Sequence, residues 1–186
     1  MPRVIYNTAS SLNGFIADDA NSLDWLFEVE IPDAAHHERF LAGIGVFVEG
    51  STTYEWVVEQ ERLLEQPHKW AEFFGDRPTF VFTTRELPTP ACADVRFVAG
   101  TVEDALPSIV AAAGNRDVWV VGGGDLAGQF LDAGALDEIQ VSIAPAMLTG
   151  GAALFPRLLG AHSLALRSIE QRGQFAHLTY DIRREP

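Results

Sequence analysis

Three consecutive glycines between an apolar strand and an amphipathic helix constrain the fold of this chain more than any other feature. VWVV at residues 118–121 is a continuous apolar run, which is typical of a central strand covered on both faces. Gly122, Gly123 and Gly124 follow, and residues 125–134 have the apolar spacing of one helix face. Backbone amides at a helix N-terminus can bind an anion there, and glycine lets the anion approach without a Cβ in the way. The pattern predicts a phosphate site, with a tight turn that binds nothing as the alternative.

The rest of the chain alternates strand and helix patterns and then becomes mainly β. Strands are expected at residues 3–10, 45–49, 78–84, 95–98, 118–121, 138–144, 164–171 and 175–183, and helices at 32–43, from 51, at 101–113 and at 125–134. This order predicts an α/β fold with a mixed, mainly parallel central sheet, an antiparallel C-terminal edge and helices on both faces. A length of 186 residues fits a single domain over residues 1–186.

Composition excludes several classes of partner. The net charge of −13 argues against nucleic acid, because phosphate contacts need clustered Lys and Arg. Any phosphate site must therefore use backbone amides and one or two local cations. Cys92 is the single cysteine, so a reducing compartment is expected. The sequence has neither a signal-peptide pattern nor an apolar run of the roughly 20 residues that a membrane span needs, which predicts a cytoplasmic protein without membrane contact.

The glycine turn does not fit the two common nucleotide motifs. Gly122, Gly124 and Ala127 match G-x-G-x-x-A, but a Rossmann unit needs an acidic residue after the next strand, and Asp137 and Glu138 precede that strand. No Lys-Ser or Lys-Thr follows the glycines, which rules out a P-loop.

Two other expected strand ends carry hydroxyl groups. GSTT follows one strand at residues 50–53, and TTR follows another at residues 83–85. Ligands bind beyond the carboxyl ends of strands in open α/β sheets, so these ends and the glycine turn could form one groove for a ligand with several phosphates. Helix capping and turn formation are the alternative for the four threonines.

Taken together and in order, these segments resemble the dihydrofolate reductase fold. They are most similar to the reductase domain of the bifunctional riboflavin-biosynthesis deaminase/reductase and its free-standing relatives. The matching segments are SLNGFIA (11–17), LDWL (23–26), GSTTYE (50–55), VVGGGDL (120–126), LDEI (136–139), APAMLTGG (144–151) and LFP (154–156). The resemblance covers nearly the whole chain. It implies a three-layer fold, a homodimer, and an NADPH-dependent reductase of a small pterin- or pyrimidine-like substrate.

The resemblance also implies positions for the cofactor and the substrate. The residues expected to bind NADPH are Gly122, Gly123, Gly124, Asp125 and Leu126 at the diphosphate, Gly50, Ser51, Thr52 and Thr53 on its other side, Thr83, Thr84 and Arg85 at the adenosine, and Ala9 and Ile16 at the nicotinamide. The substrate would lie against Asn7, Trp25 and the first helix with Asp33.

Two residues depart from the family pattern at the expected phosphate site. Ser51 stands where the family commonly has arginine, and Asp125 stands where folate reductases often have a basic residue. Arg85 is then the best candidate for a contact to the 2′-phosphate. NADPH is the favoured cofactor, and NADH stays open.

Hydride transfer also needs a proton donor. Asp24 is the main candidate, with Asp33, Glu28 or a bound water as alternatives, although each carboxylate could be an ordinary surface group and Trp25 could belong to the core. His36 and His37 point about 100° apart on a helix and lack a third ligand, so no metal site is expected. A true dihydrofolate reductase and a nucleotide-binding protein without catalysis remain alternative functions.

Overall fold

A mixed sheet forms the centre of the molecule. The structure, a computed structural model, describes residues 2–30 and 34–183. In this part of the chain the sheet has the order β5-β4-β3-β6-β1-β7-β10-β9. Its strands are β1 (Val4–Ser10), β3 (Ile44–Gly50), β4 (Thr79–Phe82), β5 (Val95–Val98), β6 (Asp117–Gly122), β7 (Glu138–Ile143), β9 (Leu164–Arg172) and β10 (Phe175–Ile182).

The strand directions confirm the mainly parallel sheet with an antiparallel C-terminal edge. Strands β5, β4, β3, β6, β1 and β7 run parallel to one another. Strand β10 is antiparallel to both β7 and β9. The β9–β10 hairpin turns at Gly173, whose φ of 58° suits glycine. As expected for a parallel sheet, the carboxyl ends of β1, β3, β4, β6 and β7 meet at one edge.

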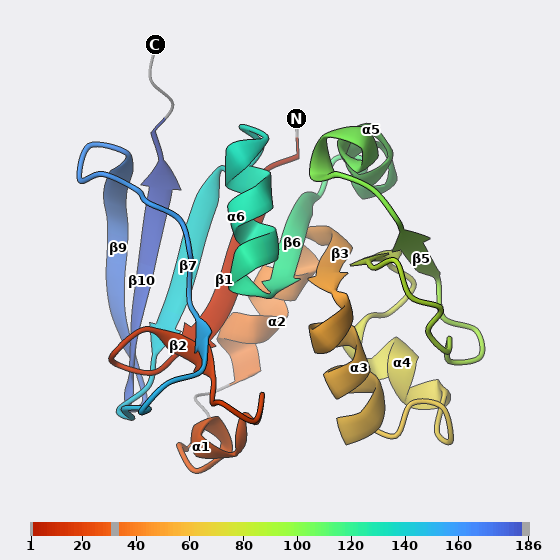
Figure 1. Cartoon of the computed structure of the whole chain (residues 1–186), viewed down its shortest axis with the longest axis horizontal. Helices are drawn as coiled ribbons and strands as arrows, with labels where there is room; N and C mark the ends of the chain where they lie inside the picture. Colours follow the sequence, from red (N-terminus) through yellow and green to blue (C-terminus); the bar gives the residue numbers. More distant parts are fainter. Residues whose placement is uncertain (1, 31–33, 184–186) are drawn as a thin grey trace.

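Helices cover both faces of the sheet and make three layers. Helices α5 (Val102–Ala113) and α6 (Gly124–Asp132) pack on one face, while α2 (Ala34–Ala42), α3 (Ser51–Gln60) and α4 (His68–Phe73) pack on the other. Figure 1 shows α6 in front of the sheet and α2 behind it. Side chains alternate along each strand, so Val48 joins the α5 and α6 core while Phe47 joins the α3 and α4 core.

Several short elements differ from the expected pattern. Residues 15–17, expected in a loop, form β2 (Phe15–Ala17), which pairs with β8 (Ala152–Ala153). Helices α1 (Asp24–Phe27) and α4 also lack a sequence prediction. These elements are too short for a visible periodicity, and β2 and β8 exist through contacts between distant segments, such as Leu154 N to Gly14 O at 2.9 Å.

One expected strand boundary differs from the structure, and one expected helix boundary lies outside the described residues. The strand expected at residues 78–84 ends at Phe82, so Thr83 and Thr84 belong to the following turn. The expected start of the first long helix, at residues 32–33, lies outside the described residues. None of the helices in the described ranges has both the length and the apolar character needed to span a bilayer.

Candidate functional site

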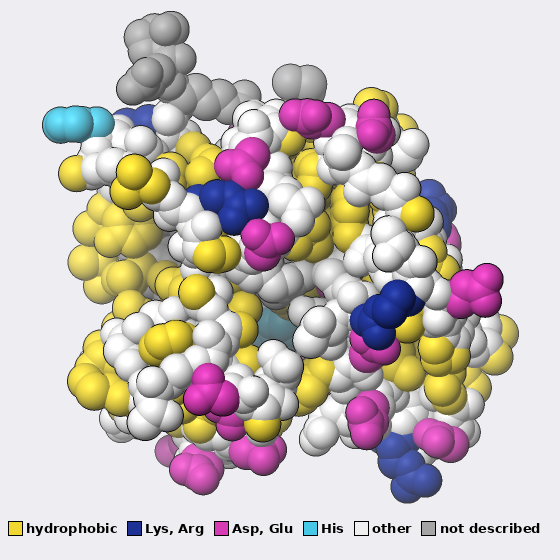
Figure 2. Space-filling model, viewed as in Figure 1, with side chains coloured by type: hydrophobic (Ala, Val, Ile, Leu, Met, Phe, Trp, Pro, Cys, Tyr) yellow, Lys and Arg dark blue, Asp and Glu magenta, His cyan; other side chains and the backbone are white. Residues whose placement is uncertain are grey.

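A cavity of about 640 Å³ opens at the carboxyl ends of the central parallel strands. This volume is within the usual range for small-molecule sites. Figure 2 shows the hollow near the centre of the molecular face, where acidic side chains are more numerous than basic ones. The cavity is lined by Thr8, Ile16, Ala17, Asn21, Leu23, Gly50, Ser51, Thr52, Thr53, Trp56, Val57, Phe82, Val121, Gly122, Gly123, Gly124, Asp125, Leu126, Gln129, Ala152, Ala153 and Pro156.

Two helices begin at the wall of this cavity without a side-chain cap. Helix α3 has Gly50 at its N-cap, and α6 has Gly123, and neither N-cap makes a side-chain hydrogen bond. Helix α5, which does not line the cavity, is capped by Thr101, whose Oγ1 accepts a hydrogen bond from Asp104 N at 3.2 Å. The first amides of α3 and α6 therefore remain available to an anion in the cavity.

The hydroxyl groups of α3 lie one to three positions after the N-cap. Thr52 and Thr53 occupy the first turn and line the cavity, and the helix has no side-chain cap hydrogen bond. Capping is therefore the wrong interpretation for these two residues. Because the hydroxyl groups sit at the same wall as the amides, they can contribute to the same anion site.

A Cβ would meet different neighbours at each of the three glycines. A Cβ on Gly124 would lie 2.4 Å from the Leu154 carbonyl oxygen, so packing against the end of β8 requires glycine there. A Cβ on Gly122 would lie 3.0 Å from Thr53 Oγ1. A Cβ on Gly123 would meet only Ile16 Cδ1, at 3.9 Å. Gly123 is thus the glycine whose Cβ would enter open space at the cavity wall, and the Gly122–Gly123 peptide bond is cis.

Asp125 lines the cavity as an ionised carboxylate that is paired with an arginine. Arg157 Nη1 lies 2.9 Å from Asp125 Oδ1, and Arg157 Nε lies 2.8 Å from Asp132 Oδ2. The hydrogen bond from Gln129, followed by that from Arg157, lowers the pKa of Asp125. Arg157 was not among the residues expected at the site. It follows LFP in the sequence, 32 residues from Asp125, and no local pattern indicates the contact.

The residues expected at the adenosine end lie outside the lining of this cavity. Arg85 binds the Glu55 carboxylate of α3, with Nη1 3.0 Å from Oε1, and its other Nη atom also donates to this carboxylate. Thr83 Oγ1 accepts a hydrogen bond from Arg85 N at 2.9 Å, which is a turn-forming role. Neither these two residues nor Thr84 is among the lining residues, and Phe82 lines the cavity instead. Their contacts to a nucleotide remain predictions.

At the expected nicotinamide and substrate end, the residues that line the cavity lie one or a few positions away from the predicted ones. Ile16 lines the cavity as expected, but Thr8 does so in place of Ala9, because neighbouring strand residues point to opposite faces. Asn21 and Leu23 line the cavity, whereas Asn7, Asp24 and Trp25 do not. Asp24 is exposed and Trp25 half-buried on α1. Asp33 lies outside the described residues.

A buried carboxyl group precedes the Gly50 cap. Glu49 is fully buried, and within the described structure neither of its side-chain oxygens has a hydrogen-bond partner. Burial raises the pKa of Glu49 to about 8. Glu49 does not line the cavity, so it has no direct contact with a ligand there.

Histidines lie between α2 and the β7–β10 part of the sheet. The His36 and His177 rings are 5.9 Å apart, and Ser142 Oγ lies 2.9 Å from His177 Nδ1. Burial lowers the pKa of His177 to about 4 and also lowers the pKa values of His36 and His37. The buried His177 imidazole is therefore held neutral near pH 7, and none of the three histidines is among the lining residues of the cavity.

The model of the RibD C-terminal domain matches residues 2–178. This chain belongs to the RibD C-terminal domain family. The match confirms the resemblance to riboflavin-biosynthesis reductase domains. YwjB of Bacillus subtilis strain 168, an uncharacterized protein, is 26% identical over 180 residues, which are 96% of this chain and 97% of YwjB.

Solved structures of the family share the fold. A putative riboflavin biosynthesis protein from Shewanella sp. PV-4 has a TM-score of 0.78 and 24% identity, with 99% of this chain and 100% of that chain covered. The Thermotoga maritima diaminohydroxyphosphoribosylaminopyrimidine deaminase/5-amino-6-(5-phosphoribosylamino)uracil reductase has a TM-score of 0.67 and 17% identity. That alignment covers 98% of this chain but 57% of the Thermotoga chain. These structures confirm the dihydrofolate-reductase-like fold.

Proposed function

We propose that this protein is an NADPH-dependent reductase of a small heteroaromatic, pterin- or pyrimidine-like substrate. The observation that carries the proposal is that two helices without side-chain caps begin at one cavity, at the carboxyl ends of the strands. Membership of a reductase-like family supports the same function. A bound nicotinamide would supply the hydride, since the cofactor carries this chemistry.

The chain's own residues would bind and orient the dinucleotide. The amides after Gly50 and Gly123 would bind the diphosphate from two sides, helped by the Thr52 and Thr53 hydroxyl groups. Ile16 and Thr8 would flank the nicotinamide. The open space beside Gly123 fits this proposal, because a Cβ there would stand at the phosphate wall. NADPH is preferred to NADH because Arg85 and Arg157 lie next to the helices that line the cavity.

One observation favours a second candidate, a nucleotide-binding protein without catalysis. Within residues 2–30 and 34–183, Asp125 is the one charged residue that lines the cavity, and Arg157 neutralises it. The described part of the cavity wall thus offers no unpaired carboxyl group as a general acid. A reductase would take its proton from water, whereas a binding protein would show cofactor binding without turnover, including on dihydrofolate.

Cofactor titration tests the proposal. NADPH is added while the tryptophan fluorescence is recorded, because Trp56 lines the cavity. Wild type should show saturable quenching, and Gly123→Ala should weaken NADPH binding by about tenfold by placing a methyl group at the phosphate wall. Gly160→Ala is the matched control, since a Cβ on Gly160 has no atom within 4 Å. Absence of saturable binding by wild type would overturn the proposal.

We also propose that residues 1–186 fold as one domain and assemble as a homodimer. Leu166 and Ile169 of the edge strand β9 are 51% and 65% exposed. Apolar side chains also gather over β9 and β10 on the face shown in Figure 2. Exposed apolar surface of this kind is typical of an interface. Sedimentation velocity should give the mass of two chains, and a monomer at all concentrations would contradict the dimer.

A further inference from the structure

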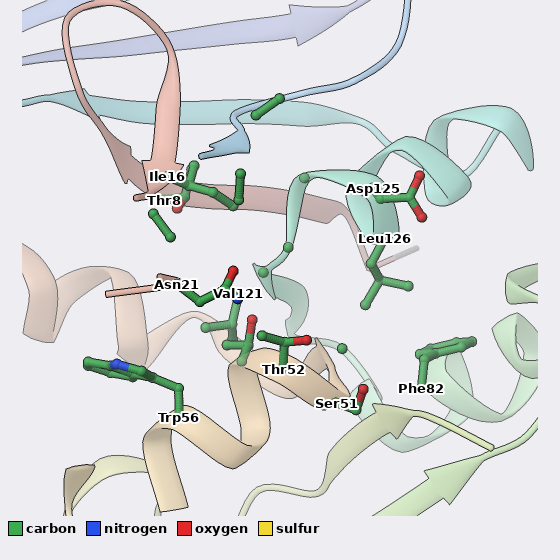
Figure 3. Close-up of a pocket in the computed structure, with 18 of the residues that line it drawn as sticks. Thr8, Ile16, Asn21, Ser51, Thr52, Trp56, Phe82, Val121, Asp125 and Leu126 are labelled. Atoms are coloured by element: carbon green, nitrogen blue, oxygen red, sulfur yellow. The ribbon is translucent and has the colours of Figure 1, made fainter. Parts of the chain in front are cut away.

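The cavity has two chemically different ends. Figure 3 shows Thr8, Ile16, Asn21, Val121 and Trp56 gathered at one end, which we call the ring end. The opposite end, with Ser51, Phe82, Asp125 and Leu126, adjoins the starts of α3 and α6. Because the proposed phosphate contacts belong to the opposite end, the ring end is where the substrate would meet the nicotinamide.

The ring end has a flat aromatic wall. The Trp56 ring stacks on Phe27 of α1, with the centroids 6.1 Å apart and an angle of 9° between the ring planes. Ile16 and Val121 add apolar surface on β2 and β6. A planar ring can stack on such a wall and gain from burial of its faces. The shape of this end thus favours a flat ring.

The polar groups at the ring end are an amide and a hydroxyl. Asn21 sits in a turn held by Asp18, whose Oδ1 accepts hydrogen bonds from Ala20 N at 2.9 Å and Ser22 N at 2.8 Å. The Asn21 side-chain amide makes no hydrogen bond with another described residue. A primary amide offers donors and an acceptor together, which complements the N–H and C=O edge of a lactam ring. Thr8 adds a hydroxyl group, which donates a long hydrogen bond of 3.3 Å to Ala9 O.

Positive charge is absent from the described lining of the cavity. Arg157 and Arg85 are both held by carboxylates of the helices next to the opposite end. The buried His177 imidazole, on the α2 side of the sheet, is kept neutral because burial lowers its pKa to about 4. A phosphate group brought to the ring end would lose water without gaining a cation, and it would also face a net protein charge of −13.

We propose that the ring end binds a neutral planar ring with an amide-like edge, such as an unphosphorylated pyrimidine or pteridine, and discriminates against the phosphorylated form. The name of the Thermotoga protein, in contrast, specifies a phosphoribosyl substrate. The inference rests on the proposed function, which assigns the opposite end of the cavity to the cofactor phosphates.

The test compares uridine with uridine 5′-monophosphate, two probes that differ by one phosphate group. Binding is measured by calorimetry with and without saturating NADPH. Uridine should bind at least about tenfold more tightly than its monophosphate. Equal or tighter binding of the monophosphate would overturn the inference, and so would failure of uridine to bind up to its solubility limit.

Two variants locate the effect at the ring end. Asn21→Asp keeps a residue type that tolerates the φ of 58° at this position but replaces the amide donor by an anion. It should weaken uridine binding by about tenfold without changing the melting temperature. Leu23→Lys places a cation in the wall and should strengthen binding of the monophosphate, while Leu23→Met, its neutral control, should not. Unchanged uridine binding in Asn21→Asp would contradict the assignment of the lactam edge.

The outcomes separate this inference from the proposed function. Absence of NADPH binding by wild type would overturn the reductase proposal, while the uridine comparison without NADPH would still decide the ring-end selectivity. Normal NADPH binding together with a preference for the monophosphate would overturn the ring-end inference alone.

Discussion

Glu49 couples the stability of the protein to pH at the scale of one residue. Its pKa is about 8 in the folded chain, compared with an ordinary value of 4.5. The folded state therefore retains a proton that the unfolded state loses as pH rises from 4.5 to about 8, so the free energy of unfolding falls across this window. Glu49→Gln should remove this loss and stabilise the protein by a few kcal/mol above pH 8.

Urea unfolding of wild type and Glu49→Gln at matched pH values measures the effect. The difference between the two proteins should be largest above pH 8 and smallest near pH 4.5. His177 contributes with the opposite sign, because its low pKa makes stability fall as pH drops from 6.5 towards 4. Subtracting the two profiles removes this contribution. A difference that is independent of pH would contradict the burial argument for Glu49.

The Asp125–Arg157 pair should tune cofactor affinity. Asp125→Asn removes a negative charge from the cavity wall and frees the Arg157 guanidinium, so NADPH should bind several-fold more tightly. Arg157→Gln leaves the Asp125 carboxylate without this cation and should weaken binding by about tenfold. Titration of NADPH measures both variants and the double variant.

Arg96→Gln is the matched control for this pair. Arg96 makes an exposed ion pair with Asp94 at 2.8 Å, and neither residue lines the cavity. The Arg96→Gln variant should bind NADPH with the same affinity as wild type. Tighter binding by Arg157→Gln would show that the pair does not act through charge at the cavity wall.

At the scale of elements, Gly124 packs the start of α6 against the end of the β2–β8 ribbon. Gly124→Ala would bring a Cβ to 2.4 Å from the Leu154 carbonyl oxygen, so the backbone of one element must shift. Crowding of this kind costs about 1–3 kcal/mol, and the melting temperature should fall. Gly160→Ala, which has open space, should melt as wild type does. Equal melting temperatures for Gly124→Ala and wild type would mean that the β2–β8 ribbon moves aside without a loss of stability.

Long elements could be predicted from the sequence, and short ones could not. VWVV at residues 118–121 is apolar on both faces because β6 lies between two parallel strands with helices on either side. The hairpin around Gly173 also follows from local pattern. Strands β2 and β8, in contrast, depend on each other across more than 130 residues, and such pairing leaves no local signal.

The same division applies to the candidate site. The resemblance predicts the cavity residues from Gly50 to Thr53 and from Gly122 to Leu126, because these segments carry specific motifs in a specific order. Ala9 was predicted in place of Thr8. An error of one residue along a strand selects the side chain on the opposite face of the sheet. Arg157 was missed because its partner lies 32 residues away, and Asn21 because its turn is set by Asp18 hydrogen bonds.

At the scale of the whole molecule, the proposed binding of an anionic cofactor by an acidic chain depends on local geometry. The parallel strands bring two helix starts to one edge of the sheet, where their amides can bind phosphate despite the net charge of −13. Arg85 and Arg157, which contact these two helices, are paired with the carboxylates of Glu55 and Asp125. In the proposed function, one cavity thus holds a phosphate-binding end and a neutral ring end.

A crystal structure with NADPH bound is the sharpest test of the proposed function. We expect the diphosphate to lie within about 3 Å of the first backbone amides of α3 and α6, with the nicotinamide beside Ile16 and Thr8. A cofactor bound away from the carboxyl ends of β3 and β6, or a cavity that stays empty at saturating NADPH, would contradict it.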